Sequence, residues 1–261
     1  MEQHHKEAIE IFLKRYSDDE SILAILLGGS LAHGFAVPDS DIDVAIIVDS
    51  EEFQKRKKER KLAFSLWDIC TYEHGYVDCK VVDLAFLQKI AEHGSDASRY
   101  AFKDSIILYT KIEGLEELLA KVVKYPEASA DDRRKRFASQ ILAWKWYFGE
   151  GVKKNNKYIQ SLAVQKFILF SARIVLNENR MLFPFHKWML KELETAPDMP
   201  EGMMTDIYGL LDDPSNEKIN VLYNKVFDFI GFSDNTVDWP NYFMADSEQN
   251  WIDHEPPVDD L

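Results

Sequence analysis

The chain of 261 residues contains only two cysteines, Cys70 and Cys79, and no C-x-x-C spacing typical of redox or zinc motifs. We interpret both as reduced thiols and expect a cytoplasmic protein without a disulfide framework. Apolar runs approaching the ~18 residues of a membrane span are also missing, so we expect no membrane partner. The N-terminal stretch "MEQHHKEAIEIFLKRY" has the apolar spacing of a helix and not of a signal peptide.

Basic side chains are scarce relative to acidic ones. The chain has 31 Lys and Arg against 45 Asp and Glu, which gives a net charge of -14. A surface this acidic repels phosphate backbones, so nucleic acid is not an expected partner, whereas a cationic small molecule is favoured. Apolar residues make up 46% of the sequence, as in an ordinary globular protein with a sizeable core.

Two common nucleotide-binding signatures are missing, because the sequence contains neither G-x-x-x-x-G-K-[ST] nor G-x-G-x-x-G. What it does contain is Gly28-Gly29-Ser30, directly after the apolar run "SILAILL". Glycine lets the backbone approach a ligand, Ser30 can cap a following helical turn, and free N–H groups at a helix start attract anions. This stretch therefore predicts a phosphate-binding turn.

Two aspartates follow on the next predicted strand. Asp41 and Asp43 are residues i and i+2, so they share one face of the strand, about 6.6 Å apart. Two carboxylates this close repel each other unless a cation lies between them, and Mg²⁺ prefers such oxygen ligands together with substrate phosphates. Asp39 is interpreted as a loop residue, and Asp49 as the cap of the next helix.

A third carboxylate is expected on a neighbouring strand. In "YVDCKVV", Asp78 alternates with the apolar Val77 and Cys79, which predicts a polar face that carries Asp78 and Lys80. Lys80 could neutralise a phosphate or pair with the acids. Asp83 is the alternative third acid, although it falls on the opposite face of an unbroken strand.

The type of predicted secondary structure changes near residue 125. Strands are predicted at 21–27, 42–48, 76–84 and 105–109, with helices at the N-terminus and at 30–35, 51–66, 85–93 and 113–124. From residue 131 onward only helical periods are found, and residues 232–261 read as an irregular acidic tail. We therefore predict an α+β protein, with a small mixed sheet in an α/β domain (residues 1–125) and an all-α bundle (126–261).

These residues resemble the nucleotidyltransferase superfamily that includes DNA polymerase beta and kanamycin nucleotidyltransferase. The family pattern begins with a hydrophobic residue followed by Gly-Ser. After roughly ten further residues comes Asp-hydrophobic-Asp. In this sequence, Gly29-Ser30 and Asp41-Ile42-Asp43 match the two parts. The continuation "SLAHGFAVPDSDIDVAIIV" is similar to the branch that acts on small-molecule antibiotics, where G-S-x-A-x-G-x-x-x-x-S-D-I-D is typical. The helical half matches that branch in architecture only.

The resemblance implies an enzyme that transfers a nucleoside monophosphate from ATP or another NTP to a hydroxyl group and releases pyrophosphate. It implies that Asp41, Asp43 and Asp78 are catalytic and bind two Mg²⁺ ions. The nucleotide-binding residues implied are Gly28, Gly29, Ser30, His33 and Lys80. Two candidates for the general base are kept: Asp78, and the pair Glu73 and His74.

The acceptor implied is a small hydroxylated molecule, either neutral or cationic, such as an aminoglycoside or a lincosamide. A homodimer stays open as the assembly. The alternative is an antitoxin-like or regulatory protein that keeps the nucleotidyltransferase fold and binds or modifies a protein partner.

Overall fold

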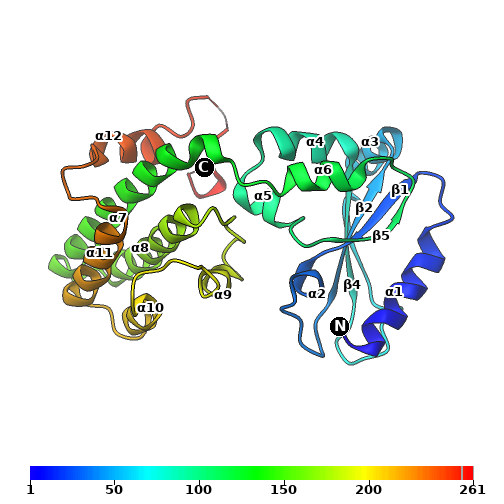
Figure 1. Cartoon of the computed structure of the whole chain (residues 1–261), viewed down its shortest axis with the longest axis horizontal. Helices are drawn as coiled ribbons and strands as arrows, with labels where there is room; N and C mark the ends of the chain where they lie inside the picture. Colours follow the sequence, from blue (N-terminus) through cyan, green and yellow to red (C-terminus); the bar gives the residue numbers. More distant parts are fainter. Residues whose placement is uncertain (254, 261) are drawn as a thin grey trace. The chain divides into compact units, whose positions relative to one another are not determined.

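The computed structural model describes residues 1–253 and 255–260. The chain divides into two compact units, Met1–Lys124 and Tyr125–Leu261, which are described separately below. The first contains a sheet with helices, and the second is helical (Figure 1).

Five strands form the sheet of the first unit, in the order β3-β4-β2-β1-β5. β2 and β4 are parallel, whereas the other neighbours are antiparallel, so the sheet is mixed. The predicted α+β class is therefore confirmed. The strands are β1 (Ile22–Leu27), β2 (Ile42–Val48), β3 (Ala63–Leu66), β4 (Val77–Asp83) and β5 (Ile106–Thr110).

Helices cover both faces of this sheet (Figure 1). On one face, Phe12 of the N-terminal helix packs in the same cluster as Ile42 and Val44 of β2. On the other, Leu87 and Leu115 pack with Ile47. Alternation along β2 thus sends successive side chains into two separate cores. The helices are α1 (Gln3–Tyr16), α2 (Gly29–His33), α3 (Ser50–Lys58), α4 (Leu84–His93), α5 (Asp96–Tyr100) and α6 (Leu115–Val122).

The helix predicted over residues 51–66 is wrong in its second half. α3 ends at Lys58, and Arg60 takes a left-handed backbone conformation with φ of 58° before β3 begins. The lysines and arginines at residues 55–61 have good helix propensity, so nothing in the sequence signals that the helix ends at Lys58. β3 is a four-residue edge strand with exposed and half-buried positions in alternation, which is a weak signal in sequence.

Arg99 ties two helix ends together inside the first unit. It is 4% exposed, and its guanidinium donates to the carbonyl oxygens of Gly94, near the end of α4, and of Val122, at the end of α6. Ala91, Lys121 and Lys124 supply three further carbonyl acceptors. The C-terminal carbonyls of a helix lack partners within the helix, so one buried cation satisfies several of them at once.

Replacing Arg99 with alanine is expected to lower the free energy of unfolding by at least about 3 kcal/mol, because several buried carbonyls lose their donor. Chemical denaturation followed by circular dichroism measures this loss. Arg15→Ala is the matched control, since Arg15 makes its ion pair with Asp68 on the surface. Equal denaturation midpoints for the two variants would show that the buried contacts of Arg99 contribute nothing.

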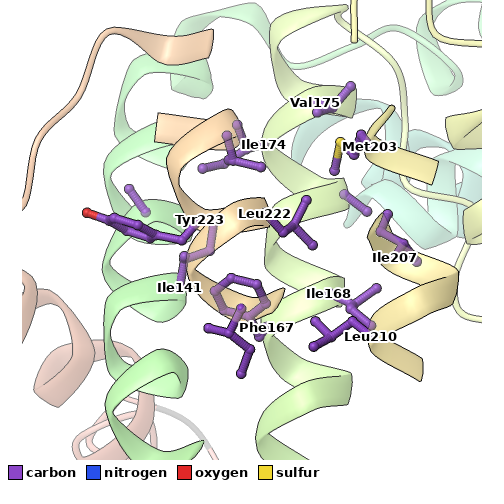
Figure 2. Packing of buried hydrophobic residues seen from close by; sticks show 14 of the residues in the cluster. Ile141, Phe167, Ile168, Ile174, Val175, Met203, Ile207, Leu210, Leu222 and Tyr223 are labelled. Atoms are coloured by element: carbon purple, nitrogen blue, oxygen red, sulfur yellow. The ribbon is translucent and has the colours of Figure 1, made fainter. Parts of the chain in front are cut away.

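The second unit is built on two long helices, α7 (Ala130–Lys153) and α8 (Lys157–Glu178). Ile141, Phe167, Leu210 and Leu222 belong to one buried cluster between the helices (Figure 2). α9 (Met189–Leu193), α10 (Met203–Asp212) and α11 (Asn216–Ile230) complete this core. The expected helical architecture of this half is therefore present.

The tail is more regular than predicted. It forms α12 (Trp239–Phe243) and one π-helical turn, Met244–Glu248. Arg136 of α7 holds this segment by a two-pronged ion pair with Asp246, with N···O distances of 3.0 and 2.7 Å. At least one acidic residue of the tail, Asp246, is therefore paired with a basic residue of the helical unit.

α8 meets the length and apolarity of a membrane-spanning helix, with a mean hydropathy of 1.4 over its most apolar window. It meets them by length and average composition only, because Lys166 and Arg173 interrupt its apolar residues. Half of that window is buried inside the protein, where Phe167, Ile174 and Val175 belong to the core. Packing within the helical unit accounts for the apolar composition of α8.

Candidate active site

The predicted phosphate-binding turn, residues 28–30, follows β1 and lies beside β2. The Gly28 N–H donates to the Asp43 carbonyl oxygen over 2.9 Å, and Gly29 has φ of 60°. A Cβ atom on Gly29 would lie 1.7 Å from Asp43 Oδ2. Glycine is required here both for its backbone conformation and because the aspartate side chain takes the space of any larger residue.

Ser30 differs from its predicted role. The N-cap of α2 is Gly28, so the Ser30 side chain does not cap the helix. Ser30 is 6% exposed, and its hydroxyl has no hydrogen-bond partner among the residues that the structure describes. A buried hydroxyl without a partner costs about 1–3 kcal/mol. Such an atom next to a glycine turn fits a phosphate oxygen as its partner.

The predicted carboxylates lie on one face at the same end of the sheet. Asp43 of β2 is the register partner of Asp78 on β4, and Asp41 stands two positions before Asp43. Partners in a ladder project from the same face, so the three side chains share it. All three are partly exposed.

Neighbouring side chains orient two of these acids. The Tyr76 hydroxyl donates to Asp41 Oδ2 over 2.9 Å, and this hydrogen bond is the main cause that raises the pKa of Tyr76 to about 12. Asp78 accepts from the Ser65 hydroxyl at 3.3 Å and lies 3.8 Å from the Lys80 ammonium. Two of the three acids, Asp41 and Asp78, are thus held by hydrogen bonds from neighbouring side chains.

Within residues 1–253 and 255–260, no three His, Cys, Asp or Glu side chains are arranged as a ready-made metal site. Asp41 and Asp78 are directed to their hydrogen-bond donors, Tyr76 and Ser65, and not to a common point. The donor chemistry nevertheless suits Mg²⁺, which takes carboxylate oxygens on one side and phosphate oxygens on the other.

The other two predicted nucleotide-binding residues differ in exposure. The His33 side chain is only 4% exposed; it packs against the Tyr100 ring at 4.7 Å and lies 3.4 Å from Asp104. His33 is therefore a packed residue at the end of α2 that holds the glycine turn in place. Lys80 is 67% exposed on the face of Asp78 and is free to swing toward a phosphate.

The remaining acids have structural roles. Asp49 caps α3 by accepting from the Glu52 N–H, as predicted, and Asp83 caps α4 by accepting from the Phe86 N–H. Asp83 therefore does not join the other acids. Glu73 and His74, the alternative for a general base, are 89% and 85% exposed in the loop before β4.

Three aromatic residues near the site were not predicted. The Tyr72 hydroxyl donates to the Ser40 carbonyl over 2.7 Å, which anchors the loop before Asp41. Tyr76 holds Asp41, and its ring stacks on Trp67 at 4.5 Å. The cluster "TYEHGY" at residues 71–76 was the available signal, but an aromatic cluster alone does not indicate which strand it faces.

Residues 7–114 match the family model described as polymerase beta, nucleotidyltransferase. The first unit is a nucleotidyltransferase domain of the polymerase beta type. The match includes the turn after β1, both strands that carry the acids and all of β5. The predicted family resemblance is therefore confirmed for this unit, and the match supports a nucleotidyltransferase enzyme.

Solved structures with low identity cover most of the chain. A nucleotidyltransferase-like protein from Exiguobacterium sibiricum is 11% identical with a TM-score of 0.47, over 94% of this chain and 80% of that one. A spectinomycin adenyltransferase from Enterococcus faecialis, solved with ATP and spectinomycin, is 13% identical with a TM-score of 0.28, over 86% and 98%.

An aminoglycoside 6-adenyltransferase from Bacillus subtilis is 11% identical with a TM-score of 0.25, over 95% of this chain and 98% of that one. All three scores are below 0.5, so the family assignment of the nucleotidyltransferase domain depends on the match to residues 7–114. No curated protein matches this chain.

Proposed function

We propose that this protein transfers a nucleoside monophosphate, AMP from ATP, to a hydroxyl group of a small molecule and releases pyrophosphate in a Mg²⁺-dependent reaction. The observation that carries the proposal is the juxtaposition of Gly29 and Asp43. The turn that would receive phosphates presses directly on the carboxylate that would bind their metal.

In this proposal Asp41, Asp43 and Asp78 hold Mg²⁺ against the triphosphate. When bound, Mg²⁺ neutralises phosphate charge and lowers the pKa of the attacking hydroxyl. The chain itself supplies positioning. Tyr76 donates to Asp41 and Ser65 donates to Asp78, and these hydrogen bonds orient the two carboxylates before the metal binds. Asp78 is the proposed proton acceptor, since Glu73 and His74 lie on an exposed loop.

The phosphate turn has a different task. Gly28 and Gly29 bring backbone close to the β- and γ-phosphates, and the Ser30 hydroxyl donates to a phosphate oxygen. His33 shapes the turn through its contact with Tyr100, and Lys80 neutralises charge from the neighbouring strand. Leaving pyrophosphate is thus stabilised by groups that are in place before the reaction.

The proposed acceptor is cationic and rich in hydroxyl groups, such as an aminoglycoside or a lincosamide. The support is electrostatic: the chain carries a net charge of -14, which favours the approach of a cationic molecule. Pyrophosphate release from ATP, with Mg²⁺ and a panel of such acceptors, tests this function. Release that depends on one acceptor and on Mg²⁺ is the expected result.

Two other outcomes are informative. No pyrophosphate with any NTP, acceptor or metal contradicts the proposed function. Labelled AMP on a protein that co-purifies with the chain, and none on a small molecule, supports the regulatory alternative.

Replacing Ser30 with alanine is expected to separate stability from nucleotide binding. The variant loses a buried hydroxyl that has no partner in the protein, so the melting temperature is expected to stay the same or rise. The KM for ATP is expected to rise about 5- to 10-fold, which corresponds to one lost hydrogen bond to a charged group. Ser40→Ala is the control, because the Ser40 hydroxyl does have a partner: it accepts from the Val37 N–H, so its loss is expected to lower the melting temperature and leave the KM unchanged. A lower melting temperature with an unchanged KM in Ser30→Ala contradicts the role assigned to Ser30.

A further inference from the structure

Trp67 stacks on Tyr76 beside Asp41 and has no part in the reaction as described so far. Trp67 follows β3 and Tyr76 precedes β4; their rings are stacked with centroids 4.5 Å apart and an interplanar angle of 25°. Trp67 is 66% exposed although one face of its indole rests on Tyr76. The other face is therefore the surface available to a ligand.

Register places this pair on the catalytic face. Ser65 is the partner of Asp78, and Leu66 is the partner of Val77, so the next opposed positions are Trp67 and Tyr76. Residues two apart on a strand share a face, which puts Trp67 with Ser65 and Tyr76 with Asp78. The hydrogen bond from Tyr76 to Asp41 fixes the stacked pair at the same end of the sheet as the acids.

Strand order decides which substrate meets the indole. The phosphate turn follows β1, the acids lie on β2 and β4, and Trp67 follows β3. The turn and Trp67 are thus on opposite sides of the carboxylates. In an in-line displacement the attacking oxygen enters opposite the leaving group. Pyrophosphate leaves toward the turn, so the acceptor approaches from the side of β3.

We propose that Trp67 is a specificity-determining residue whose indole stacks on a ring of the acceptor. This inference rests on the proposed function and adds a subsite to it. The ring chemistry that fits is a saturated ring with hydroxyl groups and an amino substituent. Its C–H face covers the indole, and its positive charge is attracted to the aromatic face.

Variants of Trp67 test this subsite in the full-length protein. Calorimetry measures binding of spectinomycin and of kanamycin to enzyme saturated with Mg²⁺ and a non-hydrolysable ATP analogue. Trp67→Ala is expected to weaken binding of at least one probe 10-fold or more and to leave binding of the ATP analogue within twofold. Trp67→Phe is expected to restore most of the affinity. Trp146→Ala is the matched control, because Trp146 is 52% exposed in the helical unit.

Three results would overturn the proposal. Equal probe binding by wild type and Trp67→Ala removes the subsite. Weaker binding of the ATP analogue by Trp67→Ala, with unchanged probe binding, assigns the indole to the nucleoside. Failure of both probes to bind wild type rejects the amino-bearing ring, while intact binding of the ATP analogue leaves the proposed function standing. Failure of wild type to bind the ATP analogue instead contradicts the proposed function itself.

Discussion

Replacing Asp43 with asparagine is expected to lower kcat/KM for nucleotidyl transfer by at least about 10³-fold, because a metal site that loses a charged ligand forfeits several kcal/mol of transition-state stabilisation. Asp43 is the central acid: it is the register partner of Asp78 and lies directly against Gly29. Asparagine keeps the shape and removes the charge. The fold is expected to persist, which circular dichroism and the melting temperature verify.

Asp39→Asn is the matched control for Asp43→Asn. Asp39 belongs to the same acidic stretch, and it is exposed on the loop before Asp41. Its replacement is expected to change kcat/KM less than twofold. If Asp43→Asn keeps more than a tenth of wild-type kcat/KM, Asp43 is not a metal ligand in the reaction.

Replacing Gly29 with alanine is expected to lower transfer at least about 100-fold and to destabilise the protein by about 2–4 kcal/mol. Two effects combine. A side chain at φ of 60° is strained, and the added methyl group would lie 1.7 Å from Asp43 Oδ2, so the aspartate or the turn must move. Steady-state kinetics and chemical denaturation measure the two losses.

Gly34→Ala separates strain from the clash with Asp43. Gly34 ends α2 with φ of 74°, and no described atom lies within 4 Å of a Cβ built there. Alanine at this position is expected to cost about 1 kcal/mol of stability, from backbone strain alone, and to leave kcat/KM within threefold. Similar kinetic losses in both glycine variants would contradict a specific contact between Gly29 and Asp43.

Much of the first unit could be predicted from sequence because its signals are local. β2 coincides with the predicted strand at 42–48, since a run of branched apolar residues alternates with Asp43. The same alternation in β4 singled out Asp78 over Asp83, and the structure pairs Asp78 with Asp43. The pair Asp41 and Asp43, the glycine turn and the polar face of Asp78 are each recognised from short spacing or from strand periodicity.

What could not be predicted depends on pairing between distant segments. β3 is short and follows a basic helix, so its existence became evident only from its partner β4. The stacking of Trp67 on Tyr76 and the hydrogen bond to Asp41 depend on that pairing. The missing partner of the Ser30 hydroxyl is likewise a property of the packed turn, and its sequence predicted a helix cap instead.

Metal binding tests the central claim, that the three acids and the phosphate turn form one nucleotide site, most directly. Electron paramagnetic resonance counts bound Mn²⁺, as a substitute for Mg²⁺, in the presence of a non-hydrolysable ATP analogue. We predict that wild type binds Mn²⁺ only together with the analogue, and that Asp43→Asn loses this binding while Asp39→Asn retains it. Equal Mn²⁺ binding by wild type and Asp43→Asn would contradict the account.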